Sequence, residues 1–376
     1  MIGIQMVDLR SQYEQIKSEI DQAIQEVLEN SAFINGPEVG LFARELAEYT
    51  GARYVIPCGN GTDALQIAMM ALGFTPGDEV IVPAFTYVAA VEVIALLGLR
   101  PKFVDVVPDT YELDPRALEK ALGPKVVGIV PVHLYGQCSN MEFILDLAQR
   151  NKLKVIEDTA QAIGAVYTFS DGRKAQAGTM GDIGTTSFFP SKNLGCYGDG
   201  GAMFTNDSDL AERLRMIANH GQKKKYHHDS IGVNSRLDTL QAAILRVKLR
   251  YLTGYSAARN VVADRYDQAF LKHPYIQAPY RAVNSTHVFH QYTVQVDGSS
   301  RDGLKNYLLG KGVPSMVYYP LPLHRQPAYL QYGYQPDEFP VSESLCKKVL
   351  SLPIHTEMEI AQQDYIIETI KGFYTQ

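Results

Sequence analysis

Lys192 lies in a sequence context that favours a desolvated, reactive lysine over a solvent-exposed one. It follows an apolar run, and Gly195, Gly198, Gly200 and Gly201 come soon after it. A desolvated lysine has a lowered pKa, which suits the formation of a Schiff base with an aldehyde. Glycines at this density predict a backbone packed closely against a neighbour. Taken alone, the segment could equally be a surface loop, because lysines are rarely fully buried.

Asp158 ends another apolar run and is a second candidate. A carboxylate there could bind a metal, act as a base or pair with a cation, and it could also cap the next helix. Glu157 should point to the opposite face of the strand, and no histidine stands nearby. We therefore predict no metal site. Gln161 follows three residues later, at the same end of the strand.

Gly61 and Thr62 open a helix directly after a predicted strand. The free N–H groups and the dipole at a helix start favour a phosphate. A plain glycine turn, with Thr62 or Asp63 capping the helix, is the alternative. The segment also fits the G-x-G-x-x-A dinucleotide fingerprint, but the acidic residues Asp78 and Glu79 precede the next strand instead of ending it. We therefore favour a phosphate anchor over a dinucleotide site.

Tyr87 follows the next predicted strand, where its ring could cover a planar ligand or pack at the rim. Pyridoxal phosphate needs a lysine for its aldehyde, an anion site for its phosphate and a carboxylate for its pyridine nitrogen. It also gains from an aromatic ring on its face. Lys192, Asp158, Tyr87 and the helix start at Gly61 meet these needs together, which makes the set far more specific than any one member.

The elements that must position these residues alternate regularly. Continuous apolar strands separated by helices predict a mostly parallel sheet covered by helices on both faces, with ligands outside the carboxyl ends of the strands. From residue 237 a long helical pattern leads into an α+β region. We predict a large domain over residues 1–250 and a small C-terminal α+β domain over 251–376. The predicted strands are 54–58, 79–83, 102–106, 126–130, 154–157, 183–187 and 201–205.

The composition excludes several classes of function. The net charge of −6 argues against a nucleic-acid surface, which needs a strong basic excess. The four cysteines are widely spaced, so we expect free thiols, with no disulfide framework and no structural zinc. Residues 1–10 lack the pattern of a signal peptide, and the longest apolar run, 89–99, is too short to span a membrane. We expect a cytoplasmic protein with no membrane partner.

At this point the sequence resembles a known family, the DegT-like nucleotide-sugar aminotransferases of the aspartate-aminotransferase superfamily (fold type I). The resemblance covers nearly the whole chain and implies a large domain with a mostly parallel sheet and a smaller α+β domain. Its most specific segments are residues 59–65, 83–88, 157–164, 187–201 and 232–243.

The resemblance implies roles for the cofactor residues. Lys192 would carry pyridoxal phosphate covalently and later act as acid and base, and Asp158 would pair with the pyridinium nitrogen. Gln161 would lie near the ring hydroxyl, and Tyr87 would stack on the ring. The phosphate would be held by Gly61, Thr62 and Ser187.

In the family, the Asn of a G-x-N-x-R segment reaches the cofactor phosphate from the neighbouring subunit. Here this is Asn234, which implies a homodimer with shared active sites. Most relatives have an aromatic residue next, where this chain has Ser235. Residues 232–243 look most like the branch that acts on UDP-linked 3-keto-hexuronates, and Ser235 weakens the comparison with 4-keto-sugar enzymes. Enzymes of that branch take their amino group from glutamate.

Candidate substrate residues follow from weaker matches. Arg236 could form a bidentate contact with a carboxylate of the sugar or of glutamate, or an ion pair at an interface. Gly36 and Ser191 stand where relatives touch substrate. Tyr319 and His324 belong to a segment that resembles the sugar-facing loop of the family. A lone histidine is usually structural, and only the motif favours His324.

The resemblance implies transfer of an amino group from L-glutamate, through pyridoxamine phosphate, to a UDP-linked keto-sugar. The expected acceptor carbon is C3 of UDP-2-acetamido-2-deoxy-3-oxo-glucuronate, in the synthesis of a surface polysaccharide precursor such as that of lipopolysaccharide. The alternatives are an aminotransferase of a 4-keto-6-deoxy nucleotide sugar and a keto-sugar dehydratase. Relatives that dehydrate carry histidine in place of the lysine, so Lys192 favours transamination. A regulatory protein that kept the fold would have lost the cofactor set, which is complete here.

Overall fold

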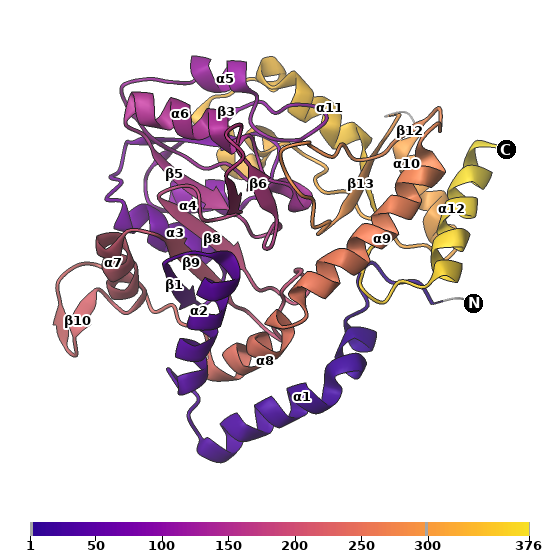
Figure 1. The fold of residues 1–376 in the computed structure, drawn as a ribbon. Coiled ribbons are helices and arrows are strands. Elements are labelled where there is room, and N and C mark those ends of the chain that lie inside the picture. Colours follow the sequence, from indigo (N-terminus) through magenta and orange to yellow (C-terminus); the bar gives the residue numbers. More distant parts are fainter. Residues whose placement is uncertain (1–2, 298–299, 376) are drawn as a thin grey trace.

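A sheet of seven strands forms the centre of the computed structural model, which describes residues 3–297 and 300–375 (Figure 1). Its strand order is β1-β9-β8-β5-β4-β2-β3. All neighbours from β3 to β8 are parallel, whereas β9 is antiparallel to both β8 and β1. The mostly parallel sheet is therefore confirmed, with one reversed strand. The bounds are β1 (Tyr54–Cys58), β2 (Glu79–Pro83), β3 (Arg100–Val104), β4 (Val126–Ile129), β5 (Lys154–Asp158), β8 (Ile183–Ser187) and β9 (Gly201–Thr205).

Both faces of this sheet are buried because successive side chains of each strand point to opposite sides. In β2, Val80 and Val82 pack into the core under α3 (Gly61–Ala71), α4 (Ala89–Leu96) and α7 (Ser208–Ala218). Ile81, between them, packs into the core under α5 (Pro115–Lys120) and α6 (Met141–Asn151). Helices therefore cover the sheet on both sides, as the alternation of strands and helices predicts.

Two long helices flank this large unit at its lower edge in Figure 1. Leu9–Asn30 (α1) and Pro37–Thr50 (α2) both pack against α8 (Thr239–Leu249). Another long helix, α9 (Leu252–Phe270), then leads away toward the C-terminal part of the chain. The boundary that the sequence predicts, between residues 250 and 251, falls between α8 and α9.

The C-terminal part has a separate apolar core in which Tyr266, Tyr292 and Ile366 are fully buried. Its antiparallel sheet has the order β12-β13-β14. No helix within residues 3–297 and 300–375 is long and apolar enough to cross a membrane. The elements of this part are β12 (Ile276–Gln277), β13 (Tyr292–Val296), α10 (Arg301–Gly310), α11 (Pro340–Lys348), β14 (Val349–Leu352) and α12 (Ile360–Tyr374).

Short elements complete the chain. In the described residues, two hairpins form small sheets of their own, and four 3-10 turns lie in loops. The hairpins are β6 (Val166–Thr168) with β7 (Lys174–Gln176), and β10 (Gln222–Lys224) with β11 (His227–His228); the 3-10 turns are Leu134–Gly136, Leu323–Arg325, Pro327–Tyr332 and Pro336–Glu338.

Candidate active site

A cavity of about 640 Å³ lies at the carboxyl ends of β5 and β8 and at the start of α3. This is the edge of a parallel sheet where ligands are expected. Nine residues that the sequence singles out line it together: Gly61, Thr62, Tyr87, Asp158, Gln161, Ser187, Ser191, Lys192 and Tyr319.

Lys192 and Asp158 face this cavity from neighbouring strand ends, and their charges interact. Burial lowers the pKa of Lys192 to about 8, and the negative charge of Asp158 partly opposes this shift. Burial also raises the pKa of Asp158, opposed by the N–H of Ala160, which donates to Asp158 Oδ1 across 3.0 Å, and by the charge of Lys192. Roughly a tenth of the lysine is then a neutral amine at about pH 7, far more than for an unperturbed lysine, and the neutral amine is the nucleophilic form.

The loop that presents Lys192 depends on glycine. The backbone N–H of Lys192 donates to the carbonyl oxygen of Phe189 across 2.8 Å, which closes a tight turn after β8. A Cβ atom on Gly195 would lie only 2.4 Å from the carbonyl oxygen of Pro190. A Cβ on Gly201 would lie 2.4 Å from the carbonyl oxygen of Asn60. The close backbone packing that the glycines predict is therefore present on both sides of the lysine.

The start of α3 forms one end of the cavity. Asn60 caps the helix, because its Oδ1 accepts from the Asp63 N–H across 2.8 Å. The cap is thus neither Thr62 nor Asp63, and the side chain of Thr62 lines the cavity. A Cβ on Gly61 would lie 2.8 Å from the Cβ of Ser187, so glycine lets α3 approach the end of β8. Helix N–H groups and two hydroxyls therefore converge where a phosphate can be held.

Gln161 is held between two tyrosines. Its Oε1 accepts from the Tyr135 N–H across 2.7 Å, and its Nε2 donates to the Tyr319 hydroxyl across 3.2 Å. Tyr319 also lies against Tyr87, with ring centroids 6.0 Å apart. Tyr87 is 55% exposed, so its ring retains free surface over the cavity. Burial raises the pKa of the Tyr319 phenol, which therefore stays neutral.

Four other residues that the sequence singles out lie outside this cavity. Asn234 is exposed, and Arg236 lines a different groove. The Gly36 N–H donates to the Thr239 hydroxyl across 3.0 Å. His324 is fully buried, lies 3.2 Å from a Glu343 oxygen and packs on Phe103 and Phe339. Its contact with substrate stays a prediction.

Sequence reasoning missed two cavity residues, His290 and Gln291, which precede β13. They enter from the C-terminal part of the chain, about a hundred positions from Lys192, and no local pattern marks them. The Nδ1 of His290 and the Oε1 of Gln291 are buried and have no partner within the described residues. Burial and the charge of Lys192 hold the pKa of His290 well below its usual range, so its imidazole is neutral.

The residues present fit pyridoxal phosphate on the chemistry of the donor set. A single cavity is surrounded by a partly neutral lysine, a buried carboxylate, an aromatic ring and the start of α3, where Gly61 allows close approach to Ser187. Within residues 3–297 and 300–375, no cluster of histidine, cysteine or acidic residues could hold a metal ion. The fold and the cavity define an aminotransferase that depends on this cofactor.

The chain belongs to the DegT/DnrJ/EryC1/StrS aminotransferase family, whose model matches residues 14–371. It is 48% identical to UDP-2-acetamido-2-deoxy-3-oxo-D-glucuronate aminotransferase of Pseudomonas aeruginosa, over 95% of this chain and 97% of that protein. A DegT DnrJ EryC1 StrS aminotransferase from Brucella abortus is 42% identical, with a TM-score of 0.93 over 99% of this chain and 100% of the other. NtdA from Bacillus subtilis, solved with bound PMP, is 34% identical, with a TM-score of 0.89 over 96% and 82% of the two chains. The protein is therefore a nucleotide-sugar aminotransferase that uses pyridoxal phosphate.

Proposed function

We propose that this protein transfers the amino group of L-glutamate to C3 of UDP-2-acetamido-2-deoxy-3-oxo-glucuronate. The presence of Lys192 and Asp158 in one cavity, where their charges interact, supports the chemistry. The 48% identity to an enzyme named for this substrate supports the acceptor. Amino sugars of this type are activated precursors, and we place the product in the synthesis of a surface polysaccharide.

The bound cofactor supplies an electron sink that stabilises negative charge at the substrate carbon next to nitrogen. Asp158 keeps the pyridine nitrogen of the cofactor protonated. The carboxyl group of Asp158 is buried, so little water screens its attraction to the protonated nitrogen. Lys192, as a neutral amine, removes the proton from the α-carbon of glutamate and returns a proton to the sugar carbon. Gly61, Thr62 and Ser187 hold the phosphate end, so the ring stays fixed while protons move.

A homodimer with shared sites accounts for the residues outside the cavity. Asn234 is exposed and does not line the cavity of its own chain. We propose that it reaches the cofactor phosphate of a second copy, and that Arg236 and Gly36 meet the substrate there. Ser191 and Tyr319 would meet the same substrate from the chain that holds the cofactor.

The attachment of the cofactor can be tested against a matched lysine. Lys248 is 1% exposed, and burial lowers its pKa to about 8, as for Lys192, but it lies outside the cavity. Borohydride reduction followed by peptide mapping should find the cofactor on Lys192 and not on Lys248. Lys192→Ala should abolish turnover, and appreciable activity in that variant would contradict the proposal.

The amino donor and the acceptor need a separate measurement. The pyridoxamine form of the enzyme should be generated by L-glutamate and consumed by the 3-keto-uronate, each seen as a change in absorbance. A faster reaction with a 4-keto-6-deoxy sugar would favour the first alternative. Consumption of the sugar with no net use of glutamate, and with loss of water, would identify a dehydratase.

A further inference from the structure

A second hollow lies outside the cofactor cavity, and of the residues that line it the proposed reaction assigns only Arg236 to the substrate. It is a groove of about 510 Å³ along the edge strand β1, between α2 and α7, with residues 235–237 also in its wall. We call it the arginine groove, because its lining includes four arginines and no aspartate or glutamate. These arginines are Arg44, Arg53, Arg215 and Arg236. Such a concentration of positive charge is unusual in a chain with a net charge of −6.

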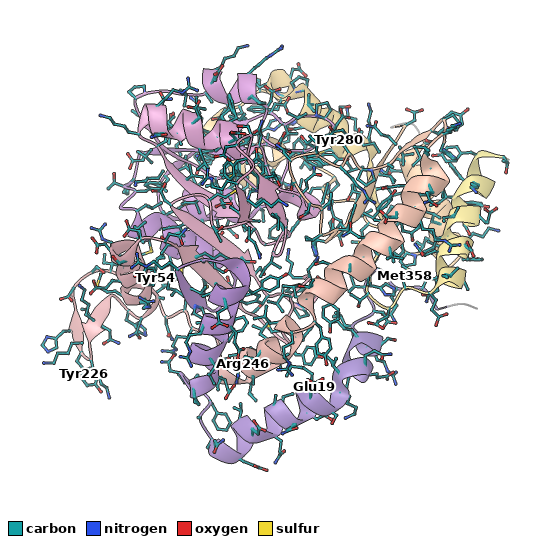
Figure 2. All side chains as sticks on the ribbon, in the orientation of Figure 1. Glu19, Tyr54, Tyr226, Arg246, Tyr280 and Met358 are labelled. Carbon is teal, nitrogen blue, oxygen red and sulfur yellow. The ribbon has the colours of Figure 1, made fainter. Side chains whose placement is uncertain are left out.

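Three acidic side chains on the adjoining helices pair with cations outside the groove, and Glu48 on α2 is exposed and does not line it. On α2, Glu38 and Glu45 both bind Arg246 of α8, which is labelled in Figure 2. On α7, Glu212 pairs with Lys223 across 2.6 Å. The described part of the chain supplies no ion pair to any of the four groove arginines. The guanidinium groups of Arg44, Arg53 and Arg215, which the proposed reaction does not use, therefore remain available to an anion from outside.

Two of these guanidinium groups are held in place by an aromatic ring. Tyr54, labelled beside α7 in Figure 2, has Arg53 at 5.3 Å and Arg215 at 5.7 Å from its ring centroid. Cation–π contacts of this kind restrain a side chain that is otherwise free, so less entropy is lost when it binds a ligand. Arg53, which directly precedes β1, and Arg215 on α7 are therefore both restrained by the same ring in the wall of one groove, where guanidinium groups can bind an oxyanion.

The groove is open because one face of α2 carries small residues. Gly40, Ala43 and Ala47 recur at helical spacing along its wall. A Cβ on Gly40 would meet nothing nearer than the Arg44 Nη1, 3.9 Å away. The volume lies within the range that small-molecule sites occupy. There is therefore room for a compact ligand between the arginines.

Ser235 separates the arginine groove from the cofactor cavity. It lines the groove, and its Oγ donates to Asp63, which lines the cavity. We propose that the arginine groove binds a small phosphorylated molecule at a site distinct from the cofactor phosphate. A phosphate or diphosphate carries the multiple charges and the tetrahedral oxygens that several guanidinium forks can bind at once.

Calorimetric titration of the holoenzyme with inorganic pyrophosphate tests this proposal, because saturating cofactor fills the other phosphate site. We expect saturable binding, at least tenfold weaker in Arg53→Gln and in Arg215→Gln. Ala47→Glu, which places a carboxylate in the groove, should abolish binding. Arg213→Gln is the matched control, since Arg213 lies on the same helix, is exposed and is absent from the groove.

Two outcomes would overturn the proposal. Pyrophosphate could bind all variants equally or fail to saturate, which would show only non-specific attraction to positive charge. Alternatively, Arg53→Gln and Arg215→Gln could change the oligomeric state in sedimentation while pyrophosphate does not bind. The groove would then be a contact between copies of this chain. A parallel titration with a dicarboxylate, expected to bind more weakly, distinguishes phosphate from carboxylate recognition.

Discussion

Ser235 Oγ donates a hydrogen bond to Asp63 Oδ2 across 2.6 Å, and the same oxygen accepts the Gly59 N–H across 2.9 Å. A side chain from the loop before α8 thereby holds the strand–helix turn at the phosphate end of the cavity. The hydroxyl of Ser235 is buried, with 2% of the residue exposed, so both bonds form where water competes little.

Ser235→Ala should weaken cofactor binding several-fold and lower the stability of the holoenzyme. The variant leaves the partly buried Gly59 N–H without its partner, at a cost of up to about 1–3 kcal/mol. Fluorescence titration of the apoprotein with pyridoxal phosphate measures the effect. Ser285→Ala is the control, because Ser285 makes an equivalent pair of bonds, to the Cys138 N–H and the Thr286 carbonyl, away from the cavity. Equal cofactor affinity in both variants would contradict a local role for Ser235.

The rate at which the cofactor attaches to Lys192 should follow the deprotonation of an amine with a pKa of about 8. Only the neutral amine attacks an aldehyde, so the rate should rise about tenfold per pH unit below pH 8 and level off above it. An unperturbed lysine would show a continued rise to a pH of about 10.4. Stopped-flow absorbance of apoprotein mixed with the cofactor gives the profile. A rise that continues beyond pH 10 would disprove a lowered pKa.

Asp158→Asn should reduce turnover by roughly 100- to 1,000-fold while the cofactor still attaches. The amide keeps the shape of the side chain but removes the charge that holds the pyridine nitrogen protonated. The negative charge of Asp158 raises the pKa of Lys192, so the attachment profile should also move to lower pH. Asp146→Asn, on an exposed residue paired only with Arg150, is the control. An unchanged turnover number in Asp158→Asn would contradict the role of Asp158 in keeping the pyridine nitrogen protonated.

Glu157→Gln should destabilise the apoprotein by roughly 3 kcal/mol. The carboxylate is fully buried and accepts from the N–H groups of Gly178, Met180 and Gly181 and from His133 Nε2. An amide would turn its own N–H groups toward these donors. Urea unfolding measures the loss. The control is Glu142→Gln, where an exposed bond to Ser170 should contribute less than about 1 kcal/mol.

Gly61→Ala should weaken cofactor binding at least tenfold. The added Cβ would lie 2.8 Å from the Cβ of Ser187 and would push α3 away from the end of β8. Equilibrium dialysis with pyridoxal phosphate measures this affinity. Gly123→Ala should leave it unchanged, because nothing lies within 4 Å of a Cβ there. Normal affinity in Gly61→Ala would show that the phosphate is held elsewhere.

The sequence by itself determined the alternation of strands and helices and the residues at the strand ends. Burial of both sheet faces requires continuous apolar strands, and the carboxyl ends of parallel strands meet at one edge. The order of residues along the chain therefore suffices to bring Lys192, Asp158, Tyr87 and the helix start at Gly61 into one site. Their spacing carries this information because each follows its own strand directly.

Only the tertiary structure decided contacts between distant segments. The reversal of β9, the entry of His290 into the cavity and the bond from Ser235 to Asp63 all depend on packing between elements far apart in sequence. His324 belongs to a motif that pointed to substrate, yet it lies beside Glu343, outside the cavity. A local pattern specifies which side chain is present, whereas the packing of the whole chain specifies what that side chain meets.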